Sequence, residues 1–73
     1  MTERTHAMQR RVGVVEAFDG GSGLGTIVDD AGVRYPFHCV ELADGTRTIE
    51  VGTSVGFTVD SRFGRREATA IVG

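Results

Sequence analysis

The sequence has no tryptophan and no lysine, and it has only one proline and one cysteine. A single cysteine excludes an internal disulfide, which is typical of proteins kept in a reducing compartment. No run approaches the roughly 20 apolar residues of a membrane-spanning helix, and the first residues lack the apolar stretch of a secretory signal. We therefore expect a cytoplasmic protein with no membrane partner.

The charge balance is slightly acidic, with a formal net charge of -2 at neutral pH. Nucleic-acid backbones attract basic surfaces, so this balance disfavours strong electrostatic binding by the chain as a whole. Because lysine is absent, every basic side chain except histidine is an arginine, which can stack on a base and also donate to a phosphate. The arginines gather in residues 10–11 and 62–66, so any basic surface is local.

A chain of 73 residues forms one small domain, whose core is too small to enclose a deep catalytic cleft. We therefore expect no enzyme activity. Hydrophobic residues make up 40% of the chain and charged residues 25%, which is typical of a folded domain rather than a disordered one. The 11 glycines lie between short apolar runs and indicate strands joined by tight turns.

The apolar pattern predicts five strands and no clear helix. Residues 1–10 are polar and aperiodic, so we expect a flexible tail there and one folded domain over residues 11–73. Strands are predicted where valine-rich or alternating segments end at glycine or aspartate, at residues 11–18, 24–28, 33–40, 53–60 and 67–72. Five short antiparallel strands predict an all-β barrel, because closure removes exposed strand edges.

Turn chemistry marks the connections between these strands. A hairpin turn is predicted at residues 29–32, with Gly32 at a positive φ, and another at residues 61–65, around Gly64. The longest connection, residues 41–52, has the length of a segment that is functional or partly helical.

Alternation assigns side chains to the two faces of each strand. Residues 54–60 place two valines and a phenylalanine on one face. Tyr35 and Phe37 are predicted to point into the barrel, and His38 to point outward. Pro36 lacks an N–H and marks either a sheet edge or a bulge, and a bulge would turn Tyr35 or Phe37 outward.

Several segments resemble motifs of the bacterial cold-shock domain, a five-stranded oligonucleotide-binding (OB-type) barrel. Residues 13–19 (GVVEAFD) resemble the family's G-x-V-K-W-F-N, and residues 22–27 (SGLGTI) resemble its first RNA-binding motif, K-G-F-G-F-I. Further segments resemble V-F-V-H-F, D-E-G-x-x-V-x-F-x-V and A-A-x-N-V, at residues 35–39 (YPFHC), 50–59 (EVGTSVGFTV) and 67–72 (EATAIV). The resemblance covers residues 11–73 and implies a cold-shock-like OB-fold.

The resemblance implies that bases stack on exposed aromatics of the second and third strands, each stack contributing about 1–3 kcal/mol. Most of those aromatic positions are occupied by other residues here. Leu24 and Thr26 stand for the phenylalanines of the first motif, and Pro36 and Cys39 for those of the second. Ala17 stands for the tryptophan of the first strand, so the usual high-affinity binding is not expected.

Two members of the stacking platform remain, Phe18 and His38. The alternative for Phe18 is packing in the core or at its rim, and for His38 a solvated surface position. Two lysines of the family are replaced by Glu16 and Ser22, and an acidic residue by Arg34. The first two exchanges weaken the basic character expected around the motifs, whereas Arg34 adds a positive charge beside Tyr35.

The last hairpin supplies the strongest remaining argument for nucleic acid. Arg62, Arg65 and Arg66 lie beside Phe63, and an aromatic tip flanked by guanidiniums can stack on bases and bind phosphates. The alternative is a solvated hairpin whose charges favour solubility.

No motif indicates a metal, a cofactor or a nucleophile. His38 and Cys39 are adjacent and point to opposite strand faces, and His6 lies in the predicted tail, so no metal site is expected. Cys39 has no activating base in a recognisable pattern. Residues 22–25 lack the Lys-Ser/Thr ending and the helix of a phosphate-binding loop.

Two functions are consistent with these observations. The first is binding of single-stranded RNA or DNA through a weakened or relocated surface. Its candidate residues are Phe18, Leu24, Thr26, His38, Arg62, Phe63, Arg65 and Arg66. The second is a non-catalytic protein-interaction or regulatory module, because an aliphatic patch suits a protein partner better than a base. That patch would consist of Ala17, Phe18, Leu24, Pro36 and Cys39.

Overall fold

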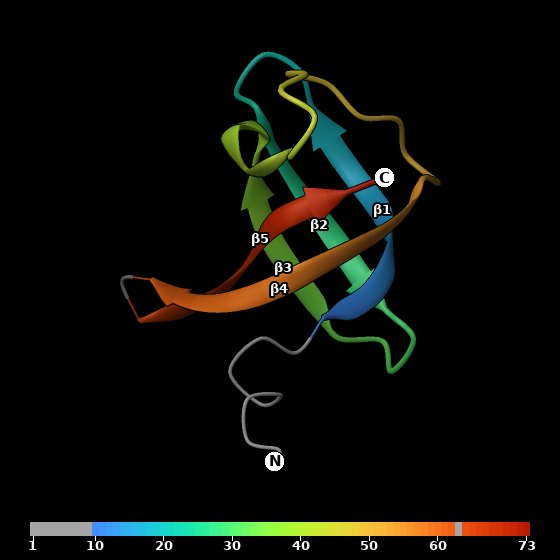
Figure 1. Cartoon of the computed structure of the whole chain (residues 1–73), viewed down its shortest axis with the longest axis vertical. Coiled ribbons are helices and arrows are strands. Elements are labelled where there is room, and N and C mark those ends of the chain that lie inside the picture. The colour runs from blue at the N-terminus through green and yellow to red at the C-terminus, as the bar shows by residue number, and fades with distance from the viewer. Residues whose placement is uncertain (1–9, 63) are drawn as a thin grey trace.

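The structure, a computed structural model, describes residues 10–62 and 64–73. It contains five strands, β1 (Arg11–Asp19), β2 (Leu24–Asp29), β3 (Arg34–His38), β4 (Ser54–Arg62) and β5 (Arg65–Val72). Every pair of neighbours is antiparallel, and the order across the sheet is β3-β2-β1-β4-β5 (Figure 1). The expected all-β fold with five antiparallel strands is confirmed.

The two tight turns between the first three strands are built by aspartates and glycines. Between β1 and β2, the Asp19 carboxylate accepts from the Gly21 N–H at 3.0 Å, and Gly23 adopts φ 78°. Between β2 and β3, Asp29 Oδ1 accepts from two backbone N–H groups, and Gly32 adopts the predicted positive φ, at 83°. Positive φ strongly favours glycine, so these positions locate the turns.

The third strand is shorter than the predicted 33–40. It ends at His38 because Cys39–Glu41 turn into a short 3-10 helix, η2. The His38 ring accepts a hydrogen bond from the Val40 N–H at 3.3 Å and so caps that turn. Among the described residues, no helix is long and apolar enough to cross a membrane.

The last hairpin is tighter than the predicted turn over residues 61–65. β4 and β5 remain paired as far as Arg62 and Arg65. Gly64 adopts φ 78°, which allows the chain to reverse within a short connection.

The ladder through Pro36 is regular, so the bulge considered for this residue is absent. Thr26 pairs with Pro36, between the pairs that Gly25 and Ile27 make with Phe37 and Tyr35. β3 is the terminal strand and pairs only with β2, which is where a residue without an N–H is tolerated.

Bulges occur instead in β1 and in the β4–β5 pair. In β1, Glu16 is the extra residue between Val15 and Ala17. In the β4–β5 pair, the register shifts between Gly56 and Thr58, and Ala70 adopts φ 49°. Bulges bend strands and increase twist, and the sheet curls until its end strands, β3 and β5, lie near each other.

Side chains from outside β5 satisfy the backbone at Ala70. Its N–H donates to Glu41 Oε1 at 3.2 Å, and its carbonyl accepts from Arg10 Nη1 at 3.0 Å. Arg10, the last residue of the predicted tail, is thus attached to the sheet. The rest of that tail, residues 1–9, lies outside the described residues.

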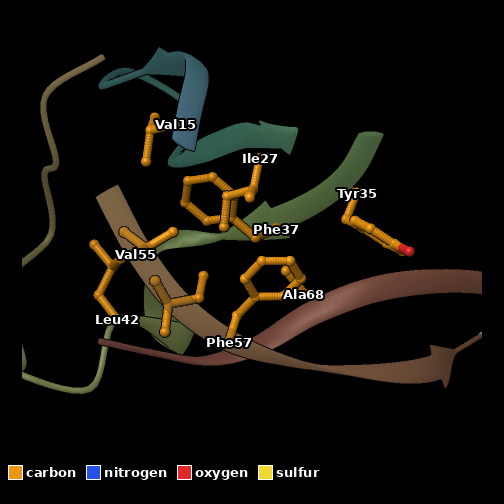
Figure 2. Packing of buried hydrophobic residues seen from close by; sticks show 9 residues of the cluster. Val15, Ile27, Tyr35, Phe37, Leu42, Val55, Phe57 and Ala68 are labelled. Carbon is orange, nitrogen blue, oxygen red and sulfur yellow. The ribbon is translucent and has the colours of Figure 1, made fainter. Parts of the chain in front are cut away.

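The concave side of the sheet holds one apolar core (Figure 2). Its buried members are Val15, Ile27, Tyr35, Phe37, Leu42, Val55, Phe57, Ala68 and Ile71. The inward positions predicted for Tyr35 and Phe37 are confirmed, and the face predicted to hold Val55, Phe57 and Val59 turns toward the core. Leu42, the first residue after η2, covers one end of the core and bridges to Ile71.

Candidate nucleic-acid interface

A hollow of about 410 Å³ lies where the end of β1 and the start of β2 meet β3 and β5. It is lined by Ala17, Phe18, Asp19, Leu24, Gly25, Thr26, Pro36, Phe37 and Arg65. Four of the eight candidate residues, Phe18, Leu24, Thr26 and Arg65, are therefore brought together from three strands.

The β1 bulge decides which side chain forms the floor of the hollow. Regular alternation from the buried Val15 would turn Ala17 inward and Phe18 outward. Because Glu16 is inserted, Ala17 is exposed and Phe18 is half-buried. Phe18 packs against the core and borders the hollow, which confirms the packing position considered for it and leaves base stacking a prediction.

The Phe18 ring is held by Phe37 across a glycine. Gly25 pairs with Phe18 on one side and with Phe37 on the other. The two rings stack with centroids 6.1 Å apart and an interplanar angle of 13°. A Cβ at Gly25 would lie 2.6 Å from Phe37 Cε1 and 2.8 Å from the Ala17 carbonyl oxygen. The glycine thus leaves the space that this stack occupies.

The remaining walls are aliphatic and small. Leu24 is 56% exposed, and Thr26 and Pro36 are half-buried cross-strand neighbours. Together with Ala17, these side chains make the surface a shallow apolar hollow rather than a row of protruding rings.

Arg65 brings positive charge to this hollow. Its Nη2 lies 3.3 Å from Glu67 Oε2, and its side chain remains 68% exposed. Because the Arg65 side chain is this exposed, the pair contributes only about 1 kcal/mol.

The negative charge of Glu16 in β1 is compensated by an arginine of β3, which lies on the far side of β2. Arg34 Nε donates to both Glu16 oxygens, at 3.0 and 2.8 Å. The hydrogen bond and the charge of Glu16 raise the pKa of Arg34 above its ordinary value. Glu16, which stands for a family lysine, is therefore charge-compensated on the same sheet.

His38 points outward as predicted and is exposed, opposite Leu24 in the ladder. It is not among the residues that line the hollow. Since its Nδ1 accepts from the Val40 N–H, its neutral form carries the proton on Nε2. The ring is thus available beside the hollow as a donor.

Cys39 does not belong to the aliphatic patch. It lies in η2, packs partly against the core, and its Sγ lies only 2.8 Å from where a Gly23 Cβ would be. Among residues 10–62 and 64–73, no group of three or more His, Cys, Asp or Glu side chains could hold a metal ion.

The other hairpin candidates do not join Arg65. Arg66 turns away and places its Cζ 5.9 Å from the centroid of the Tyr35 ring. The Arg62 backbone pairs with Arg65, but its side chain and Phe63 lie outside what the structure describes.

Sequence reasoning missed the approach of Arg11 to Tyr35. Its Cζ lies 6.0 Å from the centroid of the same Tyr35 ring. Strand alternation could have predicted this position. Arg11, Gly13 and Val15 lie on the same face of β1, and that face points inward.

Comparison with known proteins identifies the fold. No family model matches the chain, and no curated protein sequence matches it significantly. A solved structure described as "drosophila Unr CSD456", a cold-shock domain protein, is similar with a TM-score of 0.75 and 26% sequence identity. The similarity covers 92% of this chain and 27% of that chain, so this chain spans about a quarter of its length. The five strands are therefore arranged as in a cold-shock domain.

Proposed function

We propose that this cold-shock-like domain binds single-stranded RNA or DNA through the hollow beside Phe18. The observation that carries the proposal is the convergence of Phe18, Leu24, Thr26 and Arg65 on one surface. Proteins bind single-stranded nucleic acids with aromatic rings that stack on bases and with basic groups that contact phosphates. This surface offers an aromatic ring, apolar walls and an exposed guanidinium.

The mechanism follows from the shape of the hollow. One face of Phe18 is occupied by Phe37, so a base contacts the remaining surface of Phe18 and the walls formed by Leu24 and Pro36. Arg65 then donates to the adjoining phosphate, in exchange for Glu67. The surface offers one aromatic contact in place of several. The binding free energy therefore consists of about 1–3 kcal/mol from stacking of that one base, together with electrostatic attraction to the phosphates.

Fluorescence anisotropy with labelled U-rich RNA and T-rich DNA, at low and moderate salt, tests the proposal. We expect salt-sensitive binding that is weakened by Phe18→Leu, which keeps an apolar side chain but removes the ring. Arg65→Ala should reduce the salt slope by about one unit. Arg47→Ala is the matched control, because Arg47 carries the same charge but borders a different depression.

Two outcomes would argue against this site. Equal weakening by Arg65→Ala and Arg47→Ala would mean that only net charge matters. Absence of binding even at low salt would exclude simple recognition of single strands.

A protein partner is the second candidate for the same surface. The observation that favours it is the aliphatic character of Ala17, Leu24 and Pro36, which are replacements for rings at the family's motif positions. In that case Leu24→Asp would abolish partner binding, while oligonucleotides would show no salt-sensitive binding to the unaltered protein.

A further inference from the structure

Two arginines converge on Tyr35 at one end of the curled sheet. Arg11 from β1 and Arg66 from β5 place their Cζ atoms 6.0 and 5.9 Å from the centroid of the Tyr35 ring on β3. The starts of β1 and β3 both lie at the lower end of the sheet in Figure 1. None of these three residues lines the hollow beside Phe18.

The strand pattern directs both arginines toward the interior. Arg11 alternates with the buried Val15 through Gly13, and Arg66 precedes the buried Ala68 by two positions. A charged side chain at the last inward position of a strand stands at the mouth of the curled sheet. Its apolar stem can cover the core while its head meets water.

The Tyr35 hydroxyl also reaches this mouth. The ring packs against Phe57, with centroids 5.6 Å apart, and Figure 2 shows the hydroxyl pointing away from the rest of the core. Among the described residues, the Tyr35 hydroxyl has no hydrogen-bond partner. Every buried side-chain polar atom of these residues has a partner, so the Tyr35 hydroxyl oxygen is in contact with solvent. The mouth thus presents one O–H donor and two guanidiniums.

No carboxylate in the described part of the chain forms an ion pair with Arg11 or Arg66. Glu67 pairs with Arg65, Glu16 pairs with Arg34, and Asp60 accepts from the Thr69 hydroxyl at 3.3 Å. Two like charges that both approach one ring repel each other, and the ring compensates each of them only in part. A bound anion would remove this repulsion.

We propose that the mouth formed by Arg11, Tyr35 and Arg66 binds the phosphate group of a phosphate monoester. A monoester carries about −1.5 to −2 charge at neutral pH, which matches two guanidiniums. Guanidiniums donate paired hydrogen bonds to its oxygens, and the Tyr35 hydroxyl donates a further one. A phosphodiester inside a nucleic-acid strand carries a single charge and is the poorer match.

Intrinsic fluorescence reports on this site directly, because Tyr35 is the only tyrosine and the chain has no tryptophan. Inorganic phosphate is titrated at constant ionic strength, balanced with chloride. We expect a saturable change in Tyr35 emission. Arg11→Gln and Arg66→Gln should each weaken the apparent affinity at least tenfold, whereas Arg47→Gln, the charge-matched control, should leave it unchanged.

A change that grows linearly with phosphate concentration, without saturation, would overturn the proposal. An equal loss of phosphate affinity in Arg66→Gln and Arg47→Gln would also overturn it. Thermal unfolding of each variant establishes that it is folded. If Arg11→Gln fails to fold, two measurements still decide the proposal: the affinity of Arg66→Gln, and the broadening of the ³¹P signal of phosphate by the unaltered protein. A ³¹P signal that is not broadened would contradict the site.

Two further arms identify the source of the phosphate and separate this site from the hollow. Short oligonucleotides that carry either a 5′-phosphate or a 5′-hydroxyl are compared with inorganic phosphate. If the site binds the phosphorylated end of a strand, the 5′-phosphate oligonucleotide binds more tightly than inorganic phosphate. If the site binds a small free monoester, the oligonucleotide adds no affinity. Arg65→Ala should leave the Tyr35 response unchanged. The phosphate site can therefore fail or succeed independently of the proposed single-strand binding.

Discussion

The rings of Phe18 and Phe37 lie nearly parallel, with centroids 6.1 Å apart, although they come from strands that are not neighbours. The strand between them contributes Gly25, which has no side chain to separate the rings. The stack joins the floor of the hollow to the core, so core packing and the proposed binding surface depend on the same contact.

Gly25→Ala should destabilise the domain by about 1–3 kcal/mol, because the added methyl group meets the Phe37 ring and the Ala17 carbonyl. Urea unfolding measures the change. Gly20→Ala is the matched control, since a Cβ at that position meets nothing within 4 Å. Equal effects of the two substitutions would mean that Phe37 moves aside freely.

Leu24→Phe and Thr26→Phe, introduced together, should strengthen single-strand binding by about 1–3 kcal/mol for each productive stack. Both positions border the hollow, and Leu24 is already 56% exposed. Anisotropy titrations measure the gain. Val51→Phe adds an exposed ring at a side chain that is 62% exposed and does not line the hollow. A gain from that control as large as from the double variant would rule out a located site.

Ala70→Gly should stabilise the domain by up to about 1 kcal/mol, because φ 49° is costly for any residue with a Cβ. Ala70→Val should have the opposite sign, since a β-branched side chain is less tolerated there. Thermal unfolding compares the two. Destabilisation by the glycine variant would mean that its greater freedom in the unfolded chain outweighs the relieved strain.

Asp44 should titrate below the ordinary aspartate range. Hydrogen bonds from the Thr46 N–H and hydroxyl, at 3.0 and 2.8 Å, lower the pKa of its carboxyl group. The contribution of this carboxylate to stability is therefore present above the ordinary aspartate pKa and is lost as pH falls through the lowered folded value. An NMR titration of the carboxyl carbon checks the midpoint. Thr46→Ala should move it back up, and an unchanged midpoint would contradict the assignment.

The strands and the core could be predicted because they depend on local pattern. Alternation placed Tyr35 and Phe37 inside, and the structure buries both. The end of β3 could not be predicted, since Cys39 and Val40 continue the apolar run, whereas in the structure they begin η2, with His38 as its N-cap. Gly25 gave no local signal either, because its role appears only when Phe18 and Phe37 flank it.

The candidate site could be predicted only in part. The family motifs pointed to Phe18, Leu24 and Thr26, and the structure places all three around one hollow. The hairpin arginines appeared equivalent in the sequence, yet Arg65 joins that hollow and Arg66 faces Tyr35. Adjacent residues of a strand point to opposite faces, so one hairpin serves two different surfaces.

The sequence by itself determined the all-β class, the glycine-dependent turns and the inward positions, because hydrophobic periodicity and backbone sterics act over a few residues. The tertiary structure alone decided three matters: which residue of β1 faces the hollow, where Arg65 lies, and that Arg11 and Arg66 both approach the Tyr35 ring. These depend on a bulge at Glu16 and on the curl that brings β3 near β5. Register shifts and sheet curvature arise from packing across the whole sheet, which no local pattern encodes.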